Sequence, residues 1–283
     1  MNAGSIQAID EASPVEHRER QQRYYDSEIV DQEFEISRPR DAGRFYTFLM
    51  EFKVGTALRL TQRDLTGSRV LVVCAGSGMD AELLLQLGLR VTCLDISTGA
   101  LTRAAERAHL HGLAYGLVAG DAEQLPFADA SFDYSFVHDG LHHLGDPNCA
   151  IAEMARVSRH GVLITEPADA LLSSIAIRLG LMSPHEEAGN LVYRLHQARL
   201  RPLFERLGLP AVRHRRYVMK YRHKPGRLAR LLDLPLIYPL ARAAFLLFGV
   251  RLFGALGNKL ALVALRSDPV GQCEGSSQLA IGG

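Results

Sequence analysis

Residues 68–80 hold the feature that most limits the folds open to this chain. Five apolar residues at 70–74 form a run typical of a buried strand, and Gly76 and Gly78 follow directly. Helical spacing of apolar residues then begins within 81–87. A strand that turns through glycines into a helix leaves backbone N–H groups free at the helix start, where a polar or anionic ligand can approach the main chain. The segment predicts a ligand-binding turn in an α/β fold.

Segments typical of strands and of helices alternate along the following part of the chain. Strands are predicted at 90–95, 115–119, 132–138 and 161–166, and helices at 98–111 and 147–158. Two further strands are predicted at 212–221 and 260–265. Such alternation is typical of a doubly wound, parallel sheet with helices on both faces. Ligands of these sheets bind at the carboxyl ends of the strands, so we expect the functional residues there.

Composition fits one large domain with additions. The chain has 283 residues, of which 47% are hydrophobic and 22% charged, enough to bury a sizeable core. A net charge of +1 gives no reason to expect a nucleic-acid partner. The four cysteines form no C-x-x-C pair, and the polar N-terminus lacks the apolar region of a secretory signal. We therefore predict a cytoplasmic protein with free thiols.

The chain divides into three predicted regions. Residues 1–22 are expected to be disordered or loosely helical, residues 23–266 to form the domain, and residues 267–283 to form a disordered tail. Within the domain, 168–210 and 222–258 are expected to be insertions on the substrate side or at an interface. Aromatic residues gather before the first strand, and 45–60 has helical spacing. This part is either a leading helix packed on the sheet or a lid, in which Tyr25 would touch substrate.

Later motifs add acids and histidines to the strand ends. Asp95 ends a predicted strand, Asp121 lies in Gly-Asp-Ala-Glu-Gln-Leu-Pro-Phe, and residues 137–144 are Val-His-Asp-Gly-Leu-His-His-Leu. With these motifs, residues 45–167 resemble the class I S-adenosyl-L-methionine-dependent methyltransferases. In character they are closest to the small-molecule enzymes of ubiquinone and menaquinone biosynthesis. The resemblance implies a seven-stranded, mostly parallel Rossmann-like sheet with an antiparallel last strand at 260–265, plus helical insertions.

The same resemblance implies where the cofactor, S-adenosyl-L-methionine, would bind. The glycine turn would hold its methionine part, and Asp95 its ribose hydroxyls, since a carboxylate can accept two hydroxyl protons. Asp121 would accept from the adenine amino group, and the next main-chain N–H would serve a ring nitrogen. The predicted cofactor-binding residues are Gly76, Gly78, Asp95, Ile96, Asp121, Ala122 and His138.

Two positions depart from the family pattern. Val72 stands where the family usually has an acid, and Cys74 where it has its first glycine. Without that carboxylate, the cofactor's amino group is expected to meet main-chain carbonyls or water. Cys74 is expected to adopt a backbone angle acceptable to a residue with a side chain, which would displace the loop.

The acceptor is expected to be a small organic molecule, hydrophobic or anionic, and O-methylation is preferred because a histidine base is most useful there. Imidazole can take a proton near neutral pH, so His142 is the first choice of base and His138 the second. No third ligand accompanies these histidines, and no metal is predicted. The residues expected to border the acceptor are Tyr25, Asp139, His143 and Glu166.

Two other functions remain open from the sequence. Residues 76–81 also read G-x-G-x-x-A, which an NAD(P)-dependent oxidoreductase would use, with Asp95 on the ribose. Alternatively, the chain is a catalytically silent protein of this fold that binds a membrane or a partner. That interpretation draws on eight Lys or Arg residues without an acid at 213–230, followed by an apolar stretch at 234–258. We expect peripheral membrane contact, if any, through 213–258, and the oligomeric state stays open.

Overall fold

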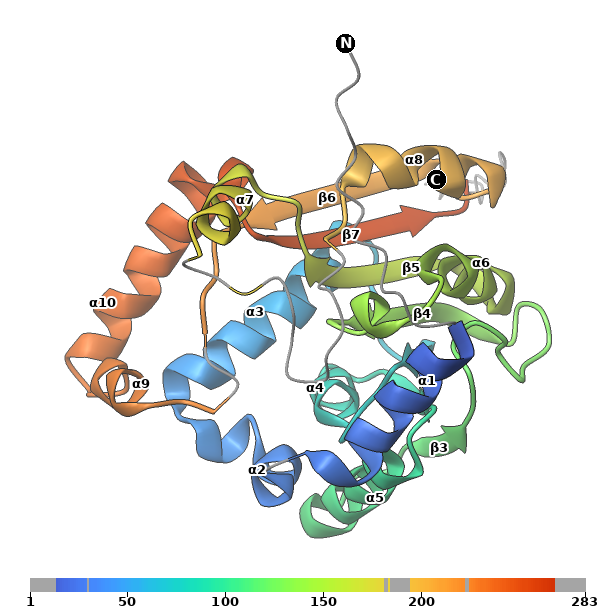
Figure 1. The fold of residues 1–283 in the computed structure, drawn as a ribbon, viewed down its shortest axis with the longest axis horizontal. Helices are drawn as coiled ribbons and strands as arrows, with labels where there is room; N and C mark the ends of the chain where they lie inside the picture. The colour runs from blue at the N-terminus through green and yellow to red at the C-terminus, as the bar shows by residue number, and fades with distance from the viewer. Residues whose placement is uncertain (1–13, 30, 181–182, 184–193, 222–223, 268–283) are drawn as a thin grey trace, which may run out of the picture.

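A seven-stranded sheet with helices on both faces forms the centre of the molecule (Figure 1). The computed structural model describes residues 14–29, 31–180, 183, 194–221 and 224–267. Along the sheet the strands follow the order β3-β2-β1-β4-β5-β7-β6. The strands are β1 (Arg69–Val73), β2 (Arg90–Asp95), β3 (Gly116–Ala119), β4 (Phe132–His138), β5 (Ser158–Pro167), β6 (Ala211–Tyr217) and β7 (Lys259–Leu265). The predicted doubly wound fold is confirmed.

Strand β7 is the one that runs against its neighbours. β1 pairs in parallel with β2 and β4, and β4 pairs in parallel with β5. β7 lies between β5 and β6 and is antiparallel to both. The predicted antiparallel last strand is therefore confirmed. A six-stranded dinucleotide-binding sheet of strand order 3-2-1-4-5-6 has no such inserted strand.

Burial on both faces explains why β1 reads as an unbroken apolar run. Val70 and Val72 belong to the core on one side of the sheet, while Leu71 and Val73 belong to the core on the other. A strand covered on both faces has no polar face, so alternation disappears from its sequence.

Ten α-helices surround the sheet in the described part of the chain. They are α1 (Pro14–Arg23), α2 (Gln32–Ser37), α3 (Arg44–Leu60), α4 (Met79–Gln86), α5 (Thr98–His111), α6 (Pro147–Val157), α7 (Leu171–Arg178), α8 (Gln197–Arg206), α9 (Arg227–Leu232) and α10 (Ile237–Ala244). Helices α3 and α4 contribute to one core, and α6 and α8 to the other. As expected for a capped start, the Asp146 side chain accepts from the backbone N–H groups of Asn148 and Cys149 at the beginning of α6.

The regions outside the sheet differ in part from their predicted form. Helix α1 crosses the predicted boundary at residue 22 and continues into a π-helical segment, Tyr24–Glu28. Helix α8, within the predicted insertion 168–210, begins at Gln197. Residues 181–182 and 184–193 of the predicted insertion 168–210, and all but residue 267 of the predicted tail, lie outside the described residues. Helix α10 continues directly into a second π-helical segment, Phe245–Leu252, so the predicted insertion 222–258 contains one long helical arm.

Candidate active site

A cavity of about 620 Å³ opens at the carboxyl ends of β1, β2 and β4. Most residues predicted for the site line it, although they come from distant parts of the chain. Those lining residues are Tyr25, Gly76, Asp95, Ile96, Asp121, Ala122, His138, Asp139, His142 and His143. Gly78 and Glu166 are not among the lining residues and lie behind its wall.

The glycine turn presents bare backbone to this cavity. Gly76 has φ +52°, and a Cβ added there would meet no atom within 4 Å. A side chain at this position would instead fill space that a ligand could use. Gly78 has a different role, because a Cβ there would lie 2.7 Å from the Tyr115 hydroxyl oxygen. Its missing side chain lets the start of α4 pack against Tyr115.

The expectation for Cys74 is wrong. Its φ is +53°, in the left-handed region that glycine adopts most easily, so the chain keeps the glycine-like angle with a cysteine. A Cβ on Gly140 would lie 2.6 Å from the Cys74 Cβ, which shows how closely the turns after β1 and β4 approach. Burial raises the pKa of the Cys74 thiol well above its usual value, so the thiol stays protonated. Val72 is a core residue, 1% exposed.

Asp95 joins the turns that follow β1 and β2. Its carboxylate accepts the Gly76 N–H at 2.8 Å and the Ser97 N–H at 2.9 Å. Burial raises the pKa of Asp95, although the hydrogen bonds from Ser97 and Gly76 oppose that shift. The acid therefore sits where it was expected and also fixes the geometry of the glycine turn.

Arg107, a buried arginine that sequence reasoning missed, also stabilises the glycine turn. Arg107 on α5 donates to the Ser77 carbonyl oxygen at 2.7 Å and to the Glu82 carboxylate at 2.9 Å, and it also donates to the carbonyl oxygen of Glu35. Its side chain is fully buried. A charged residue on the inner face of the predicted helix 98–111 was the available signal. Arg107 links α2, the glycine turn and α4.

The N-terminal segment packs against the mouth of the cavity. Arg18 on α1 forms ion pairs with Asp121 at 3.1 Å and Glu123 at 3.2 Å. Asp26 accepts the Ser97 hydroxyl at 2.7 Å, and the Tyr25 hydroxyl lies 3.1 Å from the His143 Nε2. Residues 14–28 thus border the site, as the lid interpretation requires, and part of the region expected to be loosely ordered belongs to it.

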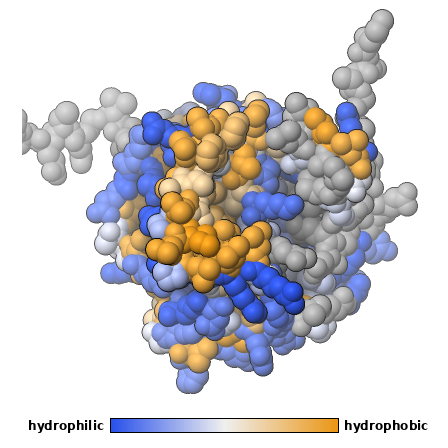
Figure 2. Space-filling model, turned by 90° about the vertical axis from the view of Figure 1, so that its left-hand side faces the viewer, coloured by the Kyte–Doolittle hydropathy of each residue, from blue (hydrophilic) through white to orange (hydrophobic). Residues whose placement is uncertain are grey.

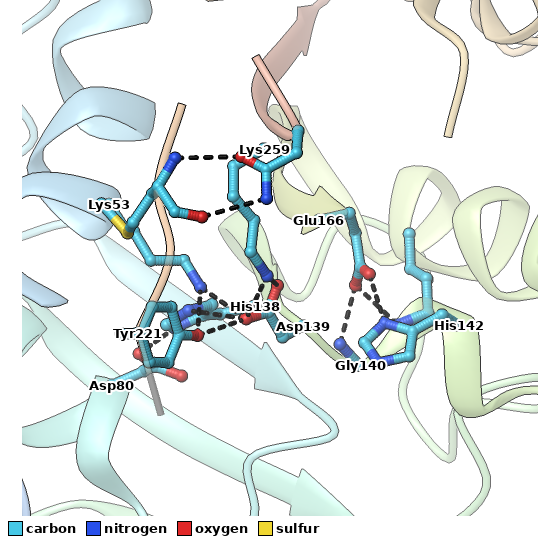
Figure 3. Close-up of polar contacts among 12 residues, drawn as sticks. Lys53, Asp80, His138, Asp139, Gly140, His142, Glu166, Tyr221 and Lys259 are labelled. Carbon is cyan, nitrogen blue, oxygen red and sulfur yellow. Dashed lines mark hydrogen bonds and ion pairs between the residues drawn. The ribbon is translucent and has the colours of Figure 1, made fainter. Parts of the chain in front are cut away.

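His142 and Glu166 form a buried pair at the end of β4 and β5 (Figure 3). The His142 Nδ1 lies 2.6 Å from one Glu166 carboxylate oxygen. The other oxygen accepts the N–H groups of Gly140 and Leu141, each at 2.7 Å. Glu166 is 1% exposed and contacts His142 rather than the cavity surface. A carboxylate at Nδ1 favours the tautomer with its proton there, which makes Nε2 the basic nitrogen.

His138 lies between two carboxylates. Its Nδ1 is 2.6 Å from an Asp80 oxygen, and its Nε2 is 3.6 Å from an Asp139 oxygen. Both ring nitrogens of His138 thus face carboxylates. Within the described residues, no three His, Cys, Asp or Glu side chains are grouped as metal ligands would be.

Asp139 is the centre of a cluster whose other members sequence reasoning did not identify (Figure 3). Its carboxylate contacts the Lys53 Nζ at 2.5 Å, the Lys259 Nζ at 3.1 Å and the Tyr221 hydroxyl at 2.9 Å. Lys53 is fully buried on α3. Burial opposes ionisation of Asp139, but Lys259 and Lys53 outweigh it and hold its pKa well below the usual range. The cluster joins α3, β7 and the turn after β4.

Replacing Asp139 with Asn is expected to lower the free energy of unfolding by about 3 kcal/mol at neutral pH, because it leaves the Lys53 ammonium buried without a counter-charge. The folded-state pKa lies below the ordinary 3.8, so the stabilisation is present above that value and is lost as the pH falls through the folded-state pKa. Urea unfolding of both proteins at decreasing pH measures the difference, which should shrink in acid.

Asp129→Asn provides the matched control for this prediction. Asp129 also pairs with an arginine, Arg156, but its side chain is 78% exposed. Exposed pairs contribute about 0–1 kcal/mol, so this variant should unfold much like the parent. A difference for Asp139→Asn that grows as the pH falls would contradict the assignment of a depressed pKa.

Comparison with known proteins shows which enzymes this chain resembles. Residues 71–165 match the family described as "Methyltransferase domain". Over 95 residues the chain is 42% identical to demethylmenaquinone methyltransferase of Renibacterium salmoninarum, covering 34% of this chain and 38% of that enzyme. The enzyme of the same name from Thermobifida fusca is 40% identical over 99 residues, covering 34% of this chain and 41% of the enzyme. The chain thus spans about two fifths of the length of these relatives.

Solved structures share the fold over a larger part of the chain. Magnesium protoporphyrin IX methyltransferase from Synechocystis PCC 6803, with bound S-adenosylhomocysteine, superposes with a TM-score of 0.58 at 17% identity, covering 87% of this chain and 98% of that one. The YcgJ protein of Bacillus subtilis superposes with a TM-score of 0.54 at 17% identity, covering 77% and 99%. In its matched segment and its fold the chain is similar to S-adenosylmethionine-dependent methyltransferases, among them enzymes of quinone biosynthesis. The NAD(P)-dependent alternative is not favoured.

Proposed function

We propose that the protein transfers a methyl group from S-adenosylmethionine to an ionisable hydroxyl of a small organic acceptor. The observation that carries this proposal is the meeting of two residue sets in one cavity. Asp95, Asp121 and the bare Gly76 backbone border it together with His142, which Glu166 orients. Asp95, Asp121 and the Gly76 backbone suit a nucleoside with an amino acid tail, and the His142–Glu166 pair suits a proton-accepting step beside it.

The cavity residues fit the cofactor. The open space over Gly76 can take its amino acid part, the Asp95 carboxylate its ribose hydroxyls and Asp121 its adenine amino group. Ile96 and Ala122 supply apolar contact. When bound, S-adenosylmethionine supplies a methyl group on a positively charged sulfur, whose leaving group is a neutral thioether. The protein therefore needs little acid catalysis and acts by alignment, exclusion of water and removal of one proton.

His142 is proposed as the base that takes the acceptor's proton at Nε2. Glu166 holds the ring through Nδ1 and stabilises the imidazolium that forms. Lys220 and Lys259 line the cavity and carry positive charge there. This charge favours an acceptor that is anionic or becomes so when it loses its proton. Tyr25, Asp139 and His143 are proposed to border that acceptor.

A second candidate reaction is C-methylation of a reduced naphthoquinone. It is suggested by the relatives named demethylmenaquinone methyltransferase, although the similarity covers about a third of this chain. Ring carbon attack on a methyl donor is helped by deprotonation of a neighbouring hydroxyl. The same His142 base would therefore serve either reaction.

Calorimetric titration with S-adenosylhomocysteine tests the cofactor half of the proposal. We expect binding in the micromolar range; no heat with this ligand or with S-adenosylmethionine would contradict it. Saturable fluorescence quenching by NADH instead would point to the oxidoreductase. A panel of phenols, together with chemically reduced 1,4-naphthoquinone, is then incubated with S-adenosylmethionine. Mass spectrometry of the products distinguishes a methyl ether from a ring-methylated quinol and so decides between the two reactions.

A further inference from the structure

Helix α9, helix α10, the π-helical segment Phe245–Leu252 and the short segments beside them expose large apolar side chains on one side of the molecule. Leu228 is 70% exposed, Leu236 85%, Leu240 69% and Leu252 59%. Further exposed members are Leu231, Leu234, Leu246, Leu247, Phe248, Phe253 and Leu256. Figure 2 shows the resulting hydrophobic area on the side formed by this helical arm, with hydrophilic groups beside it. We call residues 227–256 the apolar arm; single exposed leucines are ordinary, but so many on one arm are not.

The inner side of the apolar arm already has its packing partner. Phe245 contacts the rings of Phe48 and Phe52 on α3, with centroids 5.7 and 5.0 Å away. The Gly249 carbonyl oxygen accepts the Val218 N–H at 2.8 Å. The exposed leucines therefore lie on the side that α3 does not cover. None of residues 224–257 lines the main cavity, whereas Asn258, the last residue of the predicted insertion 222–258, does.

The apolar arm carries four arginines and a single acid, Asp233. Arg227, Arg230, Arg242 and Arg251 are exposed, and no carboxylate among the described residues forms an ion pair with them. The single acid between residues 211 and 266 is Asp233. Its carboxylate accepts the Phe45 N–H at 2.7 Å, at the start of α3. The Asp233 carboxylate therefore contacts the start of α3, and the charged groups beside the exposed leucines are arginines.

A bilayer with anionic headgroups matches this combination better than a second copy of the chain. A symmetric dimer places the same patch on both sides of its interface, so the arginines of one copy would meet those of the other. An anionic lipid surface attracts each of them and accepts the leucine side chains below the headgroups. In the described part of the chain, no helix is long and apolar enough to cross a membrane.

We propose that the apolar arm, residues 227–256, docks this protein on the surface of an anionic membrane. The outward leucines of α9, α10 and the π-helical segment enter the boundary between headgroups and acyl chains, and the arginines contact lipid phosphates. The arm lies along the membrane and does not span it. This docking goes beyond the proposed reaction and does not depend on it, because none of the described residues of the arm lines the cavity.

Sedimentation with lipid vesicles tests the proposal on the full chain. The protein should pellet with vesicles of phosphatidylcholine and phosphatidylglycerol, more weakly with phosphatidylcholine alone, and less as salt is added. Leu236→Glu/Leu240→Glu should weaken the vesicle partition coefficient by ~100-fold or more, since each buried leucine contributes about 1.5 kcal/mol or more. Arg227→Gln/Arg230→Gln should weaken it roughly 30-fold, at about 1 kcal/mol for each charge near the surface.

The matched control is Leu87→Glu/Leu110→Glu, which changes the net charge by the same amount. Leu87 is 51% exposed and Leu110 64%, and both lie outside the apolar arm. This double variant should pellet nearly as the parent does. Equal loss in both double variants would overturn the proposal, since charge alone would then explain the binding. Indifference of the parent to anionic vesicles would also overturn it. A dimer detected by sedimentation velocity without lipid would overturn it as well, if the arm variants dissociate that dimer and the parent does not bind vesicles.

Discussion

Replacing His142 with Asn is expected to lower kcat for methyl transfer by about 1,000-fold, within the range that a positioned general base contributes. The affinity for S-adenosylhomocysteine should stay close to that of the parent, because the predicted cofactor contacts lie at Gly76, Asp95 and Asp121. The measurement is a rate assay with the hydroxyl acceptor that the product screen identifies, at saturating S-adenosylmethionine. The pH profile is the decisive readout, since the limb that rises as His142 loses its proton should disappear.

Glu166→Gln separates positioning from proton transfer. Gln keeps the side-chain size and one acceptor oxygen for the N–H groups of Gly140 and Leu141, but it removes the charge opposite the His142 Nδ1. We expect a smaller fall in kcat than for His142→Asn, with the rising limb of the pH profile shifted rather than lost. If His142→Asn keeps the parental kcat while His138→Asn loses it, His138 is the base and the assignment is wrong.

Asp95→Ala is expected to weaken S-adenosylhomocysteine binding by roughly 150-fold or more, since two hydrogen bonds to a charged group contribute about 1.5 kcal/mol or more each. Removal of the carboxylate also leaves the Gly76 and Ser97 N–H groups without their acceptor, which loosens the glycine turn. Calorimetry measures the affinity, and thermal unfolding shows whether the variant remains folded. Asp95→Asn keeps an acceptor oxygen and should lose less of the affinity for S-adenosylhomocysteine.

Asp133→Ala is the control for that loss. Asp133 also uses its carboxylate to accept a backbone N–H, that of Arg69 at 2.8 Å, but it lies at the start of β4, at the opposite end of the sheet. Asp133→Ala should leave the affinity for S-adenosylhomocysteine unchanged even if it lowers the free energy of unfolding. Parental affinity in Asp95→Ala would show that the acid serves the turn and not the ribose, and the proposed cofactor site would then need revision.

Local patterns predicted most of the sheet because its central strands, such as β1 and β4, are buried on both faces and bounded by turns. Strands β2 and β4 begin and end where they were expected, and β1 and β5 differ by a few residues at their ends. The acids that follow parallel strands necessarily meet at one edge, so Asp95 and Asp121 could be placed at a common cavity. Cys74 could not be judged this way, because its left-handed angle depends on how the turn packs against Gly140.

By itself, the sequence determined the doubly wound fold, the position of the glycine turn and the choice of strand-end residues around the cavity. Only the tertiary structure decided which buried charges meet there. Lys53 and Asp139 are 86 residues apart and Arg107 and Ser77 are 30 apart, and no local spacing links them. It also decided that α1 borders the site and that the leucines of the apolar arm face outward. Hydrophobic periodicity is a local property of the chain, whereas pairing of charges and exposure of a helix face depend on which elements pack together.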